Sequence, residues 1–252
     1  MAGSPAAANS MPPLLEARGV VKRFGGLFAV RNVDLAIEAG EIVGLIGPNG
    51  AGKTTLFSVL SGFLRPEAGE VRFEGRSMVG LPPEELARLG LCRTFQLVKP
   101  FGNMTVLQNV MVGAFARLRS PSQAAREAER ILNFTGMTHL RDALAKTLPV
   151  ELRKRLEVAR TLATHPRLLL LDEVIAGLNP TEVKEMLGLL LTLSREGITL
   201  FIIEHVMAVI MSLCQRILVL HHGEKIAEGS PSEIARHPRV VQAYLGEEYL
   251  LA

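Results

Sequence analysis

The chain has 252 residues, 48% of them hydrophobic, which is enough to bury one large domain or a core with a subdomain. Its net charge of +3 is mild and tryptophan is absent, so neither a basic surface nor a base-stacking platform argues for nucleic-acid binding. The two cysteines, Cys92 and Cys214, have no metal-ligand spacing and fit a reducing compartment.

The start of the chain differs in composition from the rest. Residues 1–12 are rich in Ala, Pro, Ser and Gly, and we expect a disordered tail that lacks the basic start and apolar core of a signal peptide. No apolar stretch reaches the roughly 20 residues that a membrane span needs. Residues 13–252 are predicted to form a single domain.

Strand patterns dominate the first hundred residues. Two segments alternate polar and apolar residues as half-buried strands do, and a shorter apolar run precedes a glycine-rich loop. The predicted elements are strands at 14–21, 28–37, 42–46 and 69–73 and helices at 54–63 and 82–89.

The pattern changes at Pro100, where helical periodicity replaces strand runs, as at 106–115 and 122–134. We therefore predict a helical subdomain, at about 97–165, inserted into an α/β core. After Pro166 the α/β pattern returns.

Two uninterrupted apolar runs, 168–171 and 200–203, are typical of parallel strands that are covered on both faces. A helix at 181–195 is predicted between them. A strand at 217–220 and C-terminal helices at about 231–250 complete the prediction.

A glycine-rich motif stands between the predicted strand at 42–46 and the helix that follows. It reads Gly47-Pro48-Asn49-Gly50-Ala51-Gly52-Lys53-Thr54-Thr55. The spacing matches the phosphate-binding P-loop, whose backbone N–H groups and helix N-terminus wrap an anion. Lys53 would reach the β- and γ-phosphates, and Thr54 would offer its hydroxyl to Mg²⁺. The dinucleotide-binding spacing is absent, and so is the Asn-Lys-x-Asp motif of GTPases.

Two acidic residues follow the apolar run 168–171. Parallel sheets bind ligands beyond the carboxyl ends of their strands, so Asp172 would lie beside the P-loop and hold Mg²⁺ through a water. Glu173 would accept a proton from an attacking water. His205 follows the next apolar strand and would contact the γ-phosphate at the same sheet edge.

These motifs, in this order, resemble the ATPase subunit of an ABC transporter over about residues 14–250. The resemblance implies an α/β P-loop NTPase fold: a RecA-like core with a mostly parallel sheet, an antiparallel β subdomain and the inserted helical subdomain. Lys53, Thr54, Asp172, Glu173 and His205 stand at the Walker A, Walker B and H-loop positions of that family.

Further roles follow from the resemblance alone. Arg93-Thr94-Phe95-Gln96 looks like the Q-loop, so Gln96 would touch Mg²⁺ and the attacking water. Phe24 lies where the family stacks an aromatic ring on adenine, and Val30 would support the same base. The catalytic set would then comprise Lys53, Gln96, Glu173 and His205, with ATP and Mg²⁺ bound.

Within this superfamily the chain is most similar to the ATPases of branched-chain amino acid importers. The stretches that carry this likeness are Lys22–Leu27, Arg93–Gln96, Met104–Val110, Ala176–Pro180, Glu228–Ser230 and Ala243–Glu248. The likeness implies two transmembrane permease subunits, an external binding protein, a place on the cytoplasmic face of the inner membrane and no nucleic acid. Other amino acids, amides, urea or aromatic acids stay open as cargo.

One motif departs from the family. Its signature, Leu-Ser-Gly-Gly-Gln, contacts the γ-phosphate held by the partner subunit, but here the aligned residues are Leu148-Pro149-Val150-Glu151-Leu152. Pro149 has neither a hydroxyl nor an N–H, although it suits a helix start. Glu151 would repel a γ-phosphate, and Arg153 or Lys154 would be needed to offset its charge.

A homodimer would therefore have two impaired sites, whereas a heterodimer with a consensus relative would keep one competent site. We expect a heterodimer.

Three alternative functions stay open: an ABC ATPase that acts on nucleic acid or ribosomes, although the tandem domains or basic extension usual there are absent; a regulatory subunit that hydrolyses ATP weakly; and the ATPase of another ABC system, such as a lipid exporter.

Overall fold

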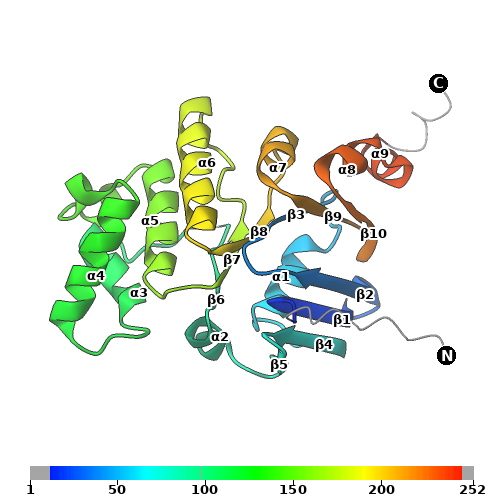
Figure 1. Cartoon of the computed structure of the whole chain (residues 1–252), viewed down its shortest axis with the longest axis horizontal. Coiled ribbons are helices and arrows are strands. Elements are labelled where there is room, and N and C mark those ends of the chain that lie inside the picture. The colour runs from blue at the N-terminus through cyan, green and yellow to red at the C-terminus, as the bar shows by residue number, and fades with distance from the viewer. Residues whose placement is uncertain (1–11, 97, 246–252) are drawn as a thin grey trace, which may run out of the picture.

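The computed structural model describes residues 12–96 and 98–245 (Figure 1). The predicted N-terminal tail lies outside this part of the chain except for Pro12, and the C-terminal end from residue 246 also lies outside it. None of the helices in the described part is both long and apolar enough to cross a membrane.

A six-stranded sheet forms the centre of the molecule. Its strands are β3 (Ile42–Ile46), β6 (Leu91–Arg93), β7 (Leu168–Asp172), β8 (Thr199–Ile203), β9 (Arg216–His221) and β10 (Glu224–Gly229). They lie in the order β10-β9-β3-β8-β7-β6, and all neighbours are parallel except β10, which runs antiparallel at the edge. Every residue of β3, β7 and β8 is buried, which explains their uninterrupted apolar runs.

A second, antiparallel sheet lies beside the first. It consists of β1 (Leu15–Phe24), β2 (Leu27–Ile37), β4 (Ala68–Phe73) and β5 (Arg76–Ser77), in the order β2-β1-β4-β5. Helix α1 (Lys53–Leu60) packs between the two sheets, where Phe57 meets Phe201 of β8 with ring centroids 4.9 Å apart. The two sheets agree with the predicted α/β fold class.

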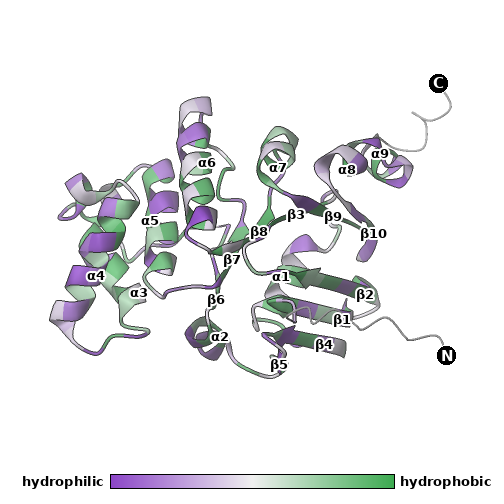
Figure 2. Ribbon diagram, viewed as in Figure 1, coloured by the Kyte–Doolittle hydropathy of each residue, from purple (hydrophilic) through white to green (hydrophobic). Residues whose placement is uncertain are grey.

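Helices gather at one end of the molecule, between β6 and β7 in the chain (Figure 1). They are α3 (Val106–Ala114), α4 (Pro121–Phe134), α5 (Val150–Leu162) and the short 3₁₀ turns Thr138–Leu140 and Ala145–Thr147. Helix α3 starts with a capping box made by Thr105 and Gln108. Helix α4 is amphipathic: it turns apolar residues to the core and polar residues to solvent (Figure 2).

The remaining helices are α2 (Pro83–Leu89), α6 (Pro180–Arg195), α7 (Met207–Leu213), α8 (Pro231–Arg236) and α9 (Pro238–Leu245). Helices α6 and α7 cover the face of the central sheet opposite α1 (Figure 1). Helix α6 begins at Asn179, whose side chain accepts hydrogen bonds from two backbone N–H groups of the first turn, and Glu182 completes the capping box.

Several elements were not predicted, and three of them illustrate the lack of a clear periodic signal. Strand β6 has only three residues, too few for an alternating pattern. Strand β10 contains Glu, Lys and Gly, and as an edge strand it tolerates polar residues on both faces. Helix α7 has seven residues and no side-chain cap at its start.

The parallel register aligns the carboxyl ends of four strands. Arg93 pairs with Leu170, and Asp172 pairs with Ile203, so the loops that follow β6, β7 and β8 leave the sheet side by side with the loop after β3. This edge of the sheet holds the residues whose side chains the sequence predicts to act together.

Candidate active site

The P-loop joins β3 to α1 and its conformation depends on glycine. Gly52 caps α1 in the left-handed region, with φ of +102°, and a β-carbon built on it would overlap the carbonyl oxygen of Ala29. A β-carbon on Gly47 would overlap the carbonyl oxygen of Leu220. The loop therefore packs so closely on neighbouring backbone that side chains are excluded at both positions.

Lys53 is buried at the start of α1, although it carries a charge. Its Nζ atom donates hydrogen bonds to the carbonyl oxygens of Gly47, at 2.7 Å, and Pro48, at 3.0 Å. Burial lowers the pKa of Lys53, while the nearby carboxylates of Glu173 and Asp172 act in the opposite direction. The ammonium group is thus held inside the loop, where a bound phosphate would meet it.

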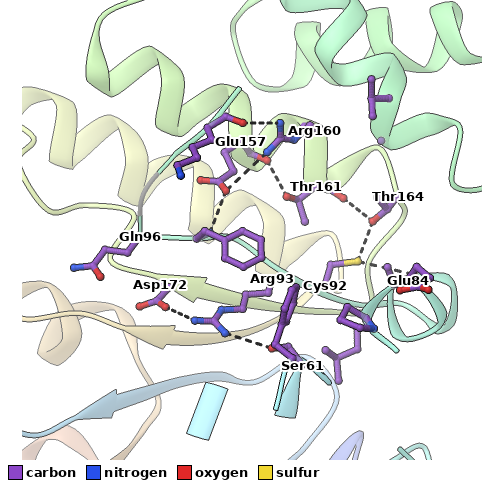
Figure 3. Close-up of a pocket in the computed structure, with 18 of the residues that line it drawn as sticks. Ser61, Glu84, Cys92, Arg93, Gln96, Glu157, Arg160, Thr161, Thr164 and Asp172 are labelled. Atoms are coloured by element: carbon purple, nitrogen blue, oxygen red, sulfur yellow. Dashed lines mark hydrogen bonds and ion pairs between the residues drawn. The ribbon is translucent and has the colours of Figure 1, made fainter. Parts of the chain in front are cut away.

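Asp172, the last residue of β7, is fixed from two sides. Its Oδ2 atom pairs with Arg93 Nη2 at 2.7 Å (Figure 3), and its backbone N–H donates to the hydroxyl of Thr94. Arg93 also donates to Ser58 Oγ of α1 at 2.9 Å. The Oδ1 atom of Asp172 is buried and has no hydrogen-bond partner among the described residues, so one carboxylate oxygen is oriented while the other is left available.

Glu173 stands between two polar side chains. Gln96 Nε2 donates to its Oε2 atom at 2.6 Å, and His205 Nε2 lies 2.5 Å from its Oε1 atom. The backbone of Glu173 has φ of +52°, an uncommon conformation for a residue other than glycine. Its N–H donates to the carbonyl oxygen of Ile203, which ties this turn to β8.

A cavity of about 490 Å³ opens over the P-loop. Among the predicted site residues it is lined by Phe24, Asn49, Gly50, Ala51, Gly52, Lys53, Thr54, Thr55, Gln96, Glu173 and His205. The structure thus brings the predicted phosphate loop, the predicted base and the predicted adenine contact to one cavity. Phe24 is half exposed at the end of β1, with its ring accessible from solvent.

The structure does not bring every predicted residue to this cavity. Val30 is completely buried in the core and does not line the cavity, so its contact with adenine stays a prediction. Gly47 and Pro48 contribute the carbonyl groups that hold Lys53 and are not part of the cavity wall.

Leu27, Phe28 and His222 line the cavity but were not predicted. His222 lies in the turn between β9 and β10. This turn was not predicted, because strand β10 was not predicted. Leu27 and Phe28 follow the glycine turn after Phe24, and their apolar side chains are exposed, which the sequence pattern does not indicate.

A second cleft of about 820 Å³ lies between the central sheet and the helices α3 and α5 (Figure 3). Thr54 and Gln96 line both this cleft and the cavity over the P-loop, and Asp172 lines the cleft. The three residues predicted to hold Mg²⁺ therefore face one shared space. Phe95 and Phe101 add exposed aromatic side chains to the same cleft.

The signature-like residues lie apart from both cavities, at the start of α5. Leu148 is buried, Pro149 is the N-cap residue, and Val150 is 59% exposed. Glu151 lies in the first turn and has no ion pair within the described part of the chain. The segment presents no hydroxyl group and no glycine backbone that a phosphate could approach closely.

Neither of the two basic residues considered as offsetting Glu151 forms an ion pair with it in the described part of the chain. Arg153 donates to the carbonyl oxygens of Leu148, at 2.6 Å, and Lys146, at 2.9 Å. Lys154 turns inward and donates to the carbonyl oxygens of Glu173 and Ala176. The charge of Glu151 is therefore uncompensated by these two side chains.

Comparison with known proteins agrees with this architecture. Residues 30–176 match the family model described as ABC transporter, and residues 224–249 match the one described as branched-chain amino acid ATP-binding cassette transporter. BraF of Pseudomonas aeruginosa strain PAO1, a high-affinity branched-chain amino acid transport ATP-binding protein, is 40% identical over 93% of this chain and 98% of its own length.

Two solved structures are similar as well. The ADP conformation of MJ1267, an ATP-binding cassette of an ABC transporter, superposes with a TM-score of 0.84 at 33% identity, covering 93% of this chain and 99% of that one. The dimeric, post-hydrolysis cassette MJ0796 bound to ADP and Pi reaches 0.78 at 25% identity over 86% and 98% of the two chains. The chain therefore belongs to the ABC transporter family, as an ATP-hydrolysing, ATP-binding subunit of the branched-chain amino acid group.

Proposed function

We propose that this chain hydrolyses ATP to power an ABC importer for branched-chain or related amino acids. The observation that carries the catalytic part is the position of Glu173: its carboxylate lies between Gln96 and His205 and lines the cavity over the P-loop. A carboxylate within hydrogen-bond reach of a bound nucleotide's terminal phosphate can take a proton from the attacking water.

The proposed reaction converts ATP and water into ADP and phosphate. Lys53 and the P-loop amides would bind the phosphates, Glu173 would accept the proton of the attacking water, and His205 would steady the γ-phosphate. Gln96 would orient both the water and the Glu173 carboxylate. Positioning and charge neutralisation supply most of the acceleration in reactions of this type.

The residues present fit a Mg²⁺ ion. Thr54, Gln96 and Asp172 face one space, and the buried Oδ1 atom of Asp172 lacks a partner among the described residues. We propose that these three side chains hold the ion, with Asp172 acting through a water. When bound, Mg²⁺ neutralises charge on the transferred phosphate.

The test of the catalytic proposal is the substitution Glu173→Gln. It preserves the size of the side chain and the contact with Gln96 but removes the proton acceptor, so ATP hydrolysis should fall at least about a hundredfold while ATP is retained. Steady-state phosphate release and equilibrium binding of ATP measure the two quantities. Undiminished hydrolysis would remove Glu173 from the role of base.

We further propose that the working unit is a heterodimer of ATPase subunits. The uncompensated Glu151 and the exposed Val150 argue against productive contact of this signature segment with a partner's γ-phosphate. The P-loop side of the chain brings Lys53, Glu173 and His205 to one cavity. A partner with a consensus signature would complete that site, and the dimeric relative MJ0796 supports dimerisation in general. If this chain hydrolysed ATP only weakly in every assembly, a regulatory role would be favoured instead.

The cleft next to Gln96 supports the proposal of permease partners. The cleft is lined by the exposed side chains of Phe95 and Phe101 and by Gln96. Gln96 also donates a hydrogen bond to Glu173. We propose that two transmembrane permease subunits dock there, which would place the chain peripherally on the cytoplasmic face of the membrane. An external binding protein would deliver the cargo.

The cargo itself is inferred only from relatives. BraF is named for branched-chain amino acid transport, and a branched-chain family model matches the C-terminal segment. Because the permeases and the binding protein would select the cargo, the test is transport by the complete complex in vesicles. Leucine-dependent stimulation of ATP hydrolysis would support the proposal, whereas stimulation only by lipid would favour an exporter.

A further inference from the structure

Two buried charged residues contact the backbone of residues 173–176 and have no part in the mechanism described above. They are Glu204, which follows β8, and Lys154, in the second turn of α5; the exposed fractions of the two residues are 1% and 7%. Charged side chains are rarely buried to this extent without a specific partner. Both are directed at the same backbone segment, residues 173–176.

Glu204 holds the middle of this segment. Its Oε1 atom accepts a hydrogen bond from the backbone N–H of Ile175 at 2.8 Å, and its Oε2 atom is buried without a partner in the described residues. Burial raises the pKa of Glu204 to about 6, an effect to which Glu173 adds and which the Ile175 and His205 amides and Lys154 oppose. Glu204 therefore faces α5, the turn after β7 and the start of its own loop.

Lys154 holds the two ends of the same segment. Its Nζ atom donates to the carbonyl oxygen of Glu173 at 2.9 Å and to that of Ala176 at 2.5 Å. Burial lowers the pKa of Lys154, and the carboxylates of Glu204, Glu173 and Glu157 act in the opposite direction. One side chain of α5 thus binds the carbonyl group of the predicted catalytic residue.

We propose that Lys154 and Glu204 are positioning residues that together fix the backbone of residues 173–176 and, through it, the carboxylate of Glu173. The proposal rests on the role proposed for Glu173. The segment requires such support because Glu173 has φ of +52°, a conformation that surrounding contacts must maintain. Hydrogen bonds from opposite charges on the N–H and C=O groups of one short turn provide it.

The arrangement also connects two parts of the molecule. Lys154 follows the signature-like segment 148–152 by two residues on the same helix, and Glu204 precedes His205 by one. The backbone at Glu173 is consequently joined to α5 on one side and to the loop that carries His205 on the other. A shift of α5 would reach the Glu173 carbonyl through a single side chain.

The experiment compares Lys154→Met, Glu204→Gln, Glu204→Ala and the double substitution Lys154→Met/Glu204→Gln in the full chain. Glu41→Gln serves as the matched control, because Glu41 also lies in an ion pair, with Arg216, but at the opposite end of β3. Two quantities are measured: hydrogen exchange of the amides of residues 174–176, and kcat and KM for ATP in the assembly in which the wild-type chain is most active.

Glu204→Ala should speed exchange of the Ile175 amide at least about tenfold and lower kcat about tenfold or more, with KM changed less than about twofold, because the P-loop is untouched. Lys154→Met should lower kcat similarly. The double variant should lose less than the product of the two single losses, because both residues hold one segment and neither charge is left unpaired. Glu41→Gln should leave exchange at 174–176 and kcat unchanged.

The proposal fails if exchange at residues 174–176 is unchanged in the Lys154 and Glu204 variants, or if exchange rises while kcat stays at the wild-type value. It also fails if kcat and KM change together, as expected for a general loss of structure. Glu173→Gln measured in parallel separates this result from the role of Glu173: if that variant is inactive while Glu204→Ala and Lys154→Met are fully active, only the positioning proposal is wrong.

Discussion

At Gly52 a single hydrogen atom in place of a side chain decides whether the P-loop can form. The residue has φ of +102°, and a β-carbon would overlap the Ala29 carbonyl oxygen, whereas a β-carbon on Gly50, with φ of +78°, would meet open space. The two glycines of one loop therefore differ in packing but share a left-handed backbone.

Gly52→Ala should lower the free energy of unfolding by more than about 2 kcal/mol, since steric overlap adds to the cost of about 1–2 kcal/mol for a left-handed alanine. Gly50→Ala should cost only the latter amount. Denaturant unfolding of both variants measures the difference. Equal losses would show that close packing at Gly52 does not limit the loop.

Glu204 makes stability depend on pH in a direction that can be derived. Burial raises its pKa to about 6 from an ordinary value of 4.5, so the folded chain binds more protons than the unfolded chain between these pH values. Stability therefore falls as pH rises through this window, by about 2 kcal/mol at 1.36 kcal/mol per pKa unit. Below pH 4.5 the penalty is absent, and above pH 6 it is complete.

Glu204→Gln removes this titration. The unfolding free energy of the wild type minus that of the variant should thus decrease by about 2 kcal/mol between pH 4 and pH 7. Denaturant unfolding at the two pH values provides the measurement. If the difference in unfolding free energy is independent of pH, the pKa of Glu204 is not raised above its ordinary value.

Predictability from sequence also varied residue by residue. The position of the P-loop, Asp172, Glu173 and His205 at one edge of the sheet could be predicted because each lies at the carboxyl end of a strongly apolar strand, and parallel strands align these ends. The burial of Val30 was not predicted, because resemblance gives a position in the chain but not the direction of a side chain. The contacts of Arg93, Lys154 and Glu204 depend on helices and strands far apart in sequence and could not be derived from local pattern.

At the scale of elements, α5 combines a good helix start with a poor phosphate contact. Pro149 caps the helix, and Glu151 lies in its first turn, where an acidic side chain favours the helix. The same features remove the hydroxyl and the glycines by which a signature segment approaches phosphate. The residues that stabilise the start of this helix are thus different from those that would bind phosphate.

Replacing Pro149, Val150, Glu151 and Leu152 by Ser, Gly, Gly and Gln should therefore raise ATP hydrolysis by the chain alone at least about tenfold. The two glycines should also destabilise α5, by about 0.5–1 kcal/mol each. Phosphate release measures the first effect. Glu151→Gln is the control, because it removes the charge without restoring the motif; an unchanged rate in the fourfold variant would contradict the account of this segment.

Element prediction succeeded where an apolar run was uninterrupted or a helical period was long. The strands β3, β7 and β8 and the helices α4 and α6 fall within a few residues of their predicted bounds. Strand β6, which delivers Arg93 to Asp172, was missed because three residues carry no period. A functional contact can therefore depend on an element that the sequence pattern does not reveal.

At the scale of the whole molecule, the predicted α/β fold and family are confirmed by the comparisons and by the two sheets. The order of motifs along the chain made this possible, because the P-loop, Q-loop, signature region, Walker B strand and H-loop follow one another in a fixed sequence. The composition of the assembly is harder to predict from one sequence, since the γ-phosphate contact at this P-loop would come from another subunit.

We propose that this chain supplies the P-loop half of an ATPase site and needs a consensus signature from a partner. A direct test is steady-state Mg-ATP hydrolysis by the purified chain, alone and mixed with a purified ABC ATPase subunit that carries a consensus signature. We predict slow ATP hydrolysis by the chain alone and a large increase in the rate on mixing. Equal, substantial activity in both samples would contradict it, because the segment Leu148–Leu152 would then serve as a signature in a homodimer.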